Sequence, residues 1–125
     1  MAHIVIYEAN DLMRALLREW LSEAGYRVSA LAPGETAPEG PADLVIASIY
    51  MPKQGGAQLV RDIQAAHPGT PVIAISAQFR SGLPAAGSTA RTLGAEQVMA
   101  KPLARGDLLT AVCAILSPPR GAPGC

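Results

Sequence analysis

Residues 43–52 read Asp43-Leu44-Val45-Ile46-Ala47-Ser48-Ile49-Tyr50-Met51-Pro52, an apolar run followed by a serine and, four residues later, by a proline. A continuous apolar run of this length is typical of a strand buried on both faces of a parallel sheet. We therefore predict a central strand over 44–47 that ends at Ser48. The identity of the residue at position 48 decides which function the chain can have.

Short apolar runs alternate with longer segments of helical period on both sides of this strand. That alternation indicates strands and helices taking turns around a parallel sheet, an α/β fold. Four further strands are predicted at 4–7, 26–30, 72–75 and 97–99, with 26–30 at an edge. Three of the predicted helices have clear ends: one runs from a cap at Asn10 or Asp11 to Gly25, one from about 57 to 66, and one from about 105 to 116.

The first predicted helix has one apolar stripe made by Leu12, Leu16, Trp20 and Ala24, so we expect Trp20 in the core. Three prolines and two glycines occupy residues 33–41, where no regular helix can form. The helix between the second and third strands should therefore be shortened or missing. Residues 79–90 contain Pro84 and many small residues, so the next helix should start late, near Ala85.

The composition is that of one domain with its own core: 125 residues, half of them hydrophobic. Ten basic and ten acidic side chains cancel, which predicts no direct nucleic-acid partner and no membrane partner. Cys113 and Cys125 are interpreted as reduced thiols, and no signal peptide or membrane span is predicted. Together these features predict a cytoplasmic protein.

Several short motifs fall in order along the chain: the run 43–52 followed by Gly55-Gly56, then Gly94-Ala95, then Lys101-Pro102. In this order and spacing they resemble the receiver domains of bacterial response regulators. The resemblance implies a flavodoxin-like, doubly wound sheet of five parallel strands in the order 2-1-3-4-5, with helices on both faces. It implies a receiver-like domain over residues 1–117 and a disordered tail over 118–125.

The resemblance also implies an aspartate at position 48 that accepts phosphate from a histidine kinase, and this chain has Ser48 there. A hydroxyl must lose its proton to a positioned base before it attacks phosphorus, and nothing near Ser48 in sequence supplies that base. Two interpretations stay open. Ser48 is either a small polar residue that ends a strand with its hydroxyl bonded to backbone, or a regulatory phosphoserine.

The resemblance implies further functional residues around position 48, and this chain has only some of them. Where the family has two acidic residues that hold magnesium, this chain has Glu8 and Ala9, so we expect magnesium binding to be weak or absent and no other cofactor. Ser76 and Lys101 match the residues that contact the phosphoryl group. We expect Glu8 and Lys101 to pair, directly or through water, because a buried unpaired charge is costly.

Val98 stands where the family often has an aromatic residue that swings during activation. Valine has one stiff torsion and no hydroxyl, so the switch is predicted to be disabled. Val98 is equally well explained as an ordinary strand residue on a half-buried surface.

We therefore predict a degenerate receiver, not an enzyme, with no catalytic residues, that binds another protein without phosphate. The candidate partners are a sensor histidine kinase, a histidine phosphotransfer protein, another response regulator or an output protein, with a homodimer as a further option. The expected partner face consists of Arg91, Glu96, Gln97, Val98, Arg105 and Leu108. The alternatives are regulation by a serine kinase at Ser48, and a flavodoxin-like protein that binds a small molecule near Glu8, Ser48, Ser76 and Lys101.

Overall fold

The computed structural model describes residues 2–32, 35, 42–49, 57–76, 97–100 and 104–116. All five predicted strands and three predicted helices are present, with ends within about two residues of those expected from sequence. In chain order they are β1 (His3–Tyr7), α1 (Asp11–Glu23), β2 (Arg27–Leu31), β3 (Leu44–Ser48), α2 (Ala57–Ala66), β4 (Val72–Ser76), β5 (Gln97–Ala100) and α4 (Arg105–Leu116).

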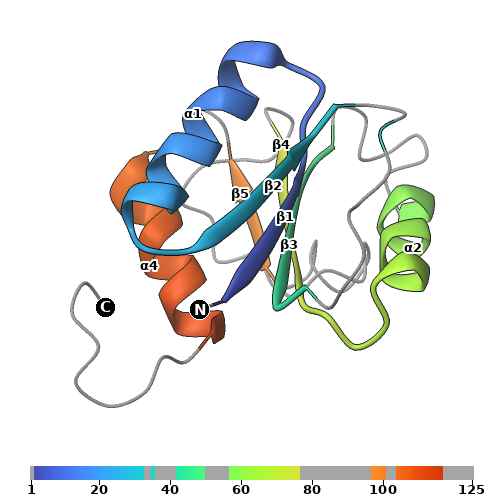
Figure 1. Cartoon of the computed structure of the whole chain (residues 1–125). Helices are drawn as coiled ribbons and strands as arrows, with labels where there is room; N and C mark the ends of the chain where they lie inside the picture. The colour runs from blue at the N-terminus through green and yellow to red at the C-terminus, as the bar shows by residue number, and fades with distance from the viewer. Residues whose placement is uncertain are drawn as a thin grey trace.

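The strands form one parallel sheet in the order β2-β1-β3-β4-β5, which confirms the predicted topology and the edge position of β2. Helices α1 and α4 cover one face of this sheet and α2 covers the other (Figure 1). The apolar runs of β3 and β4 are buried along their whole length, because helices lie on both sides of them.

Alternate residues of each strand supply two separate cores. On the side of α1 and α4, Ile4 and Ile6 of β1 belong to a cluster with Leu17, Leu21 and Leu108. On the side of α2, the next residues along the strands form a second cluster together with Ile63 of the helix; its strand members are Val5, Leu31, Val45, Ala47 and Val72. Side chains that neighbour each other along a strand therefore face different helices.

Helix α1 begins and ends as predicted but turns a different face to the core. Asn10 caps it by accepting a hydrogen bond from Met13 N at 2.8 Å, and Gly25 follows it with φ of +98°. The buried residues are Leu17 and Leu21, whereas Leu12 is 83% exposed and Leu16 is 38% exposed.

The predicted stripe through Leu12 and Leu16 is therefore wrong, although Trp20 does pack against the core. The helix contains two leucine pairs at four-residue spacing, Leu12/Leu16 and Leu17/Leu21, and periodicity alone cannot choose between them. The second pair is buried together with Met13.

Several expectations fall outside the described residues: the interrupted segment 33–41 apart from Glu35, the late helix within 79–90, and the tail 118–125. The described part of the chain contains no helix long and apolar enough to cross a bilayer.

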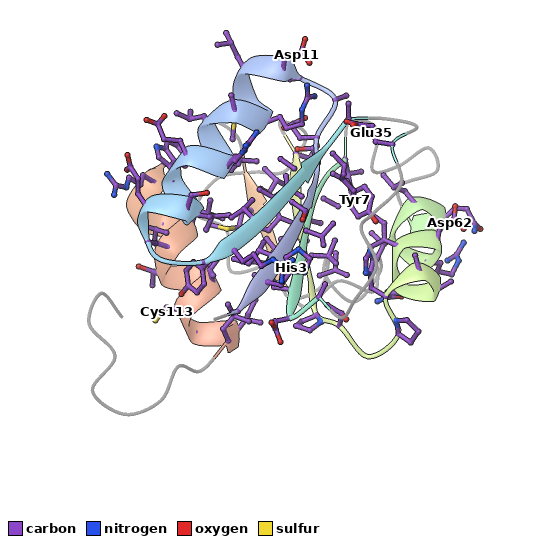
Figure 2. All side chains as sticks on the ribbon, in the orientation of Figure 1. His3, Tyr7, Asp11, Glu35, Asp62 and Cys113 are labelled. Carbon is purple, nitrogen blue, oxygen red and sulfur yellow. The ribbon has the colours of Figure 1, made fainter. Side chains whose placement is uncertain are left out.

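Cys113, on α4, is bonded in a disulfide, so the expectation of a reduced thiol at this residue is wrong. Its side chain is marked in Figure 2.

The corrected orientation of α1 makes a direct prediction about stability. Leu21→Ala should lower the free energy of unfolding by about 2–5 kcal/mol, because it removes a fully buried side chain and leaves a cavity. Leu12→Ala, on the same helix, should change it by less than about 0.5 kcal/mol. Urea denaturation of both variants measures the difference, and equal losses would contradict the observed orientation.

Candidate functional site

Two polar residues far apart in sequence meet at the carboxyl edge of the sheet. Strands β1 and β3 are parallel neighbours, and Tyr7 pairs with Ala47 in their register. The next residue on each strand is therefore brought side by side, and these residues are Glu8 and Ser48. Both are buried, with 2% and 7% of their surface exposed.

Two donors among the described residues hold the Glu8 carboxylate. Ser48 Oγ donates to Glu8 Oε1 at 2.6 Å, and the backbone N–H of Asn10 donates to Glu8 Oε2 at 3.1 Å. A hydroxyl-to-carboxylate hydrogen bond of this length is of the charge-assisted kind, about twice as strong as a neutral one. The pair satisfies polar groups that would otherwise be costly to bury.

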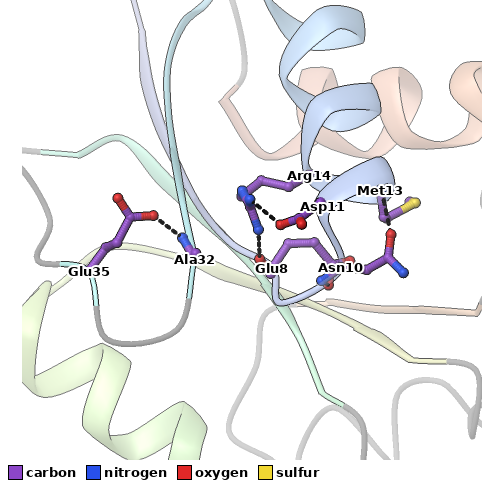
Figure 3. Close-up of polar contacts among 7 residues, drawn as sticks. All are labelled: Glu8, Asn10, Asp11, Met13, Arg14, Ala32 and Glu35. Carbon is purple, nitrogen blue, oxygen red and sulfur yellow. Dashed lines mark hydrogen bonds and ion pairs between the residues drawn. The ribbon is translucent and has the colours of Figure 1, made fainter.

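Residues at the start of α1 also contact Glu8 (Figure 3). Arg14 Nη1 donates to the Glu8 carbonyl oxygen at 2.9 Å, and its other terminal nitrogen contacts Asp11 Oδ1 at 2.5 Å. Asn10 both caps α1 and donates its N–H to Glu8. The position of the carboxylate is thus tied to the first turn of the helix.

This geometry corrects one expectation about Ser48. Its hydroxyl donates to a carboxylate and not to the backbone, so the interpretation as a backbone-bonded strand end is wrong. The carboxylate belongs to a residue 40 positions earlier in the chain, so it is not near Ser48 in sequence. Sequence reasoning did not predict this hydrogen bond, because only the pairing of β1 with β3 brings the two residues together.

The other predicted pocket residues can be placed in part. Ser76 ends β4 and is buried, and Ala9 is exposed and has no side-chain oxygen that could bind a cation. Lys101 lies outside the described residues, so its predicted pairing with Glu8 is untested. Within the described ranges no three His, Cys, Asp or Glu side chains gather as metal ligands do. Among the described residues, Glu8 is the buried carboxylate at this edge, and it accepts two protein hydrogen bonds.

The predicted partner face is also only partly described. Leu108 is fully buried and Val98 is nearly so, so neither side chain is available to a partner in this structure. Arg105 is exposed and lies 3.6 Å from Glu23 of α1. Gln97 opens β5, and Arg91 and Glu96 lie outside the described residues.

Comparison with known proteins gives one family. The family model described as response regulator receiver domain matches residues 4–113. Among curated proteins, the chain is 31% identical to the DNA-binding transcriptional regulator NtrC of Bradyrhizobium over 121 residues, covering 94% of this chain and 25% of that protein. It is 35% identical to the Regulator of RpoS of Escherichia coli over 104 residues, covering 80% of this chain and 30% of that protein.

Solved structures agree with this result. A response regulator from Burkholderia multivorans is 31% identical with a TM-score of 0.65, and the match covers 97% of this chain and 98% of that one. A response regulator receiver protein from Burkholderia phymatum is 25% identical with a TM-score of 0.74, covering 98% and 99%. The chain thus spans a quarter of the length of the first curated relative and nearly the whole of these solved chains.

The Ser48–Glu8 hydrogen bond predicts a measurable contribution to stability. Ser48→Ala should lower the free energy of unfolding at neutral pH by about 1–3 kcal/mol, because a buried carboxylate oxygen loses its hydroxyl donor. Ser22→Ala, at an exposed position on α1, is the control and should have little effect. Urea denaturation gives both values, and a Ser48→Ala protein as stable as the wild type would show that the bond adds nothing.

Proposed function

The chain belongs to the response regulator receiver domain family, and we propose that it is a pseudo-receiver of bacterial two-component signalling that binds another protein without being phosphorylated. The proposal rests on one observation: at the end of β3 stands a serine whose hydroxyl is engaged by the Glu8 carboxylate at 2.6 Å. An aspartate at this place would attack phosphorus directly as an ionised group, whereas a hydroxyl would have to lose its proton first.

The small number of possible metal ligands among the described residues at this edge of the sheet supports a site that works without metal. Magnesium is held by carboxylates and substrate phosphate, and it gives up its water reluctantly. Glu8 is the carboxylate that this edge offers among the described residues, and Ala9 offers no ligand. We propose that the module needs no magnesium or other cofactor and carries out no catalysis of its own.

An exposed apolar surface on α1 is the described feature best suited to a partner. Leu12, Ala15 and Leu16 lie at three- and four-residue spacing, on one side of the helix, and all three are exposed. We name these three residues the α1 surface. Large exposed aliphatic side chains gathered on one face are typical of protein interaction sites.

The partner classes follow from the family. A receiver-like module exchanges contacts with a sensor histidine kinase, a histidine phosphotransfer protein, another response regulator or an output protein, and a second copy of the chain is a further option. We also propose that it works in the cytoplasm, without direct nucleic-acid or membrane contact. The disulfide at Cys113 is evidence against that compartment, because cytosolic thiols are usually reduced.

A second candidate function is favoured by a specific observation, the position of Glu8. A serine hydroxyl that donates to a buried carboxylate has the arrangement of a nucleophile with its base. In such a step Glu8 takes the hydroxyl proton, Ser48 Oγ forms a bond to phosphorus, and the donor's leaving group departs with the electrons of its own bond to phosphorus. Glu8, then protonated, no longer repels the new phosphate.

The first candidate predicts that binding depends on the α1 surface. Leu16→Glu should reduce partner recovery from a lysate of the source bacterium at least about tenfold, because it places a charge in the apolar contact. Leu59→Glu is a matched control, since Leu59 of α2 is 39% exposed and Leu16 is 38% exposed. Quantitative mass spectrometry of the captured proteins gives the result, and equal losses with both variants would reject the α1 surface.

The second candidate predicts a stable phosphoester. Protein purified from its own host should carry a phosphoryl group on Ser48 that survives neutral hydroxylamine, and Glu8→Gln should abolish it because the base is lost. Phosphopeptide mass spectrometry checks both statements. If wild-type protein carries no phosphate on Ser48, the second candidate is rejected and the phosphate-independent module stands.

A further inference from the structure

Two histidines are buried on the side of the sheet that α2 covers. His3 begins β1 and His67 follows α2 directly, and each has less than a tenth of its surface exposed. His3, Val5 and Tyr7 alternate along β1, and Val5 and Tyr7 belong to the cluster on the α2 side. Neither imidazole contributes to the Glu8–Ser48 site.

The ring of His67 joins α2 to β1. His67 Nε2 and Tyr7 Oη are hydrogen-bonded at 2.7 Å, and the two rings meet edge to face with centroids 5.9 Å apart. The backbone of His67 continues the helix pattern, because its N–H donates to the Ile63 carbonyl at 2.9 Å. The same residue is therefore part of the helix end and, through its side chain, part of the contact with the sheet.

Helix α2 has few other anchors among its described side chains. Val60 and Ile63 are buried, whereas Gln58, Leu59, Arg61 and Asp62 face solvent. Among the described residues, the apolar cluster on this side of the sheet has fewer members than the one beneath α1 and α4. The contact between His67 and Tyr7 joins the carboxyl end of α2 to β1.

We propose that the His67–Tyr7 contact is an acid-sensitive latch, which holds α2 on the sheet while His67 is neutral and releases it when His67 is protonated. Protonation puts a positive charge into a buried site that already contains a second imidazole, His3. Protonated Nε2 can still donate to the Tyr7 hydroxyl, so the contact is weakened by the cost of placing a charge in a buried site and not by loss of the hydrogen-bond donor or acceptor. Tyr7 directly precedes Glu8, so the latch acts on the strand end that carries the candidate site.

The described carboxylates around the latch are hydrogen-bonded to groups other than His67. On β1, His3 Nε2 is hydrogen-bonded to Ser29 of β2 at 2.8 Å, and the carboxylate of Asp43 accepts the backbone N–H of His3 at 2.7 Å. On α2, Asp62 accepts from Gln58 on the exposed side of the helix. Beyond β2, Glu35 accepts the N–H of Ala32. The described carboxylates near this face are thus bonded to other groups.

The pKa values agree with the geometry. Burial lowers the pKa of His67 below its ordinary 6.5, and the nearby His3 lowers that pKa further. Burial raises the pKa of Tyr7 above 10.0, so its hydroxyl keeps its proton at neutral pH. Because the pKa of His67 is depressed in the folded state, its contribution to stability is complete above 6.5 and is lost as the pH falls through the folded value.

The test compares the full chain with His67→Gln, which keeps a polar side chain at this site but does not titrate. As the pH falls from about 7 to about 5, the unfolding constant of the wild type should rise relative to that of His67→Gln by up to about tenfold per pH unit. A ratio of the two constants that stays level over this range would overturn the proposal. His3→Gln is the control, and it should keep the acid response because the contact between His67 and Tyr7 is unchanged.

A second measurement covers the case in which His67→Gln fails to fold. In wild-type protein, amide hydrogen exchange corrected for intrinsic rates should show the protection of α2 falling on acidification, while that of β1, β3 and β4 is kept. The titration of the His67 ring proton by NMR should give a pKa below 6.5. A pKa at or above that value, or a uniform loss of protection across α2 and the strands, would refute the latch.

Discussion

The hydrogen bond from Ser48 to Glu8 is the interaction on which the functional account depends. It exists because β1 and β3 are parallel neighbours in a register that pairs Tyr7 with Ala47, so that the two following residues meet at the sheet edge. A buried carboxylate must find donors, and here it finds a hydroxyl and a helix-start amide. The carboxylate is therefore engaged by the protein's own groups.

Much of the fold followed from sequence, since the apolar runs of β3 and β4 and the caps of α1 are local signals. The face of α1 did not, because Leu12/Leu16 and Leu17/Leu21 have the same spacing, and only packing against the rest of the fold selects the second pair. The role of Glu8 could not be predicted from its neighbours either, since its partner lies 40 residues away. The contact between Tyr7 and His67 spans 60 residues and has the same cause.

Strand β1 connects the two polar systems of the molecule. Its last residue, Tyr7, contacts α2 through His67, and the residue after it, Glu8, contacts β3 through Ser48 and α1 through Asn10 and Arg14. The end of this strand is therefore in contact with both helices and with β3.

The claim that the carboxyl-edge site does not sense phosphate is tested most directly by adding magnesium and beryllofluoride, a mimic of an acyl phosphate, to the purified domain. The amide chemical shifts of Glu8, Ser48 and Ser76 are followed, with an Ala9→Asp, Ser48→Asp double variant as the positive control. The account predicts no localised, saturable shifts in the wild-type protein and such shifts in the double variant. Saturable shifts at these three residues of the wild type would show that the pocket still binds a phosphoryl group, and would contradict the account.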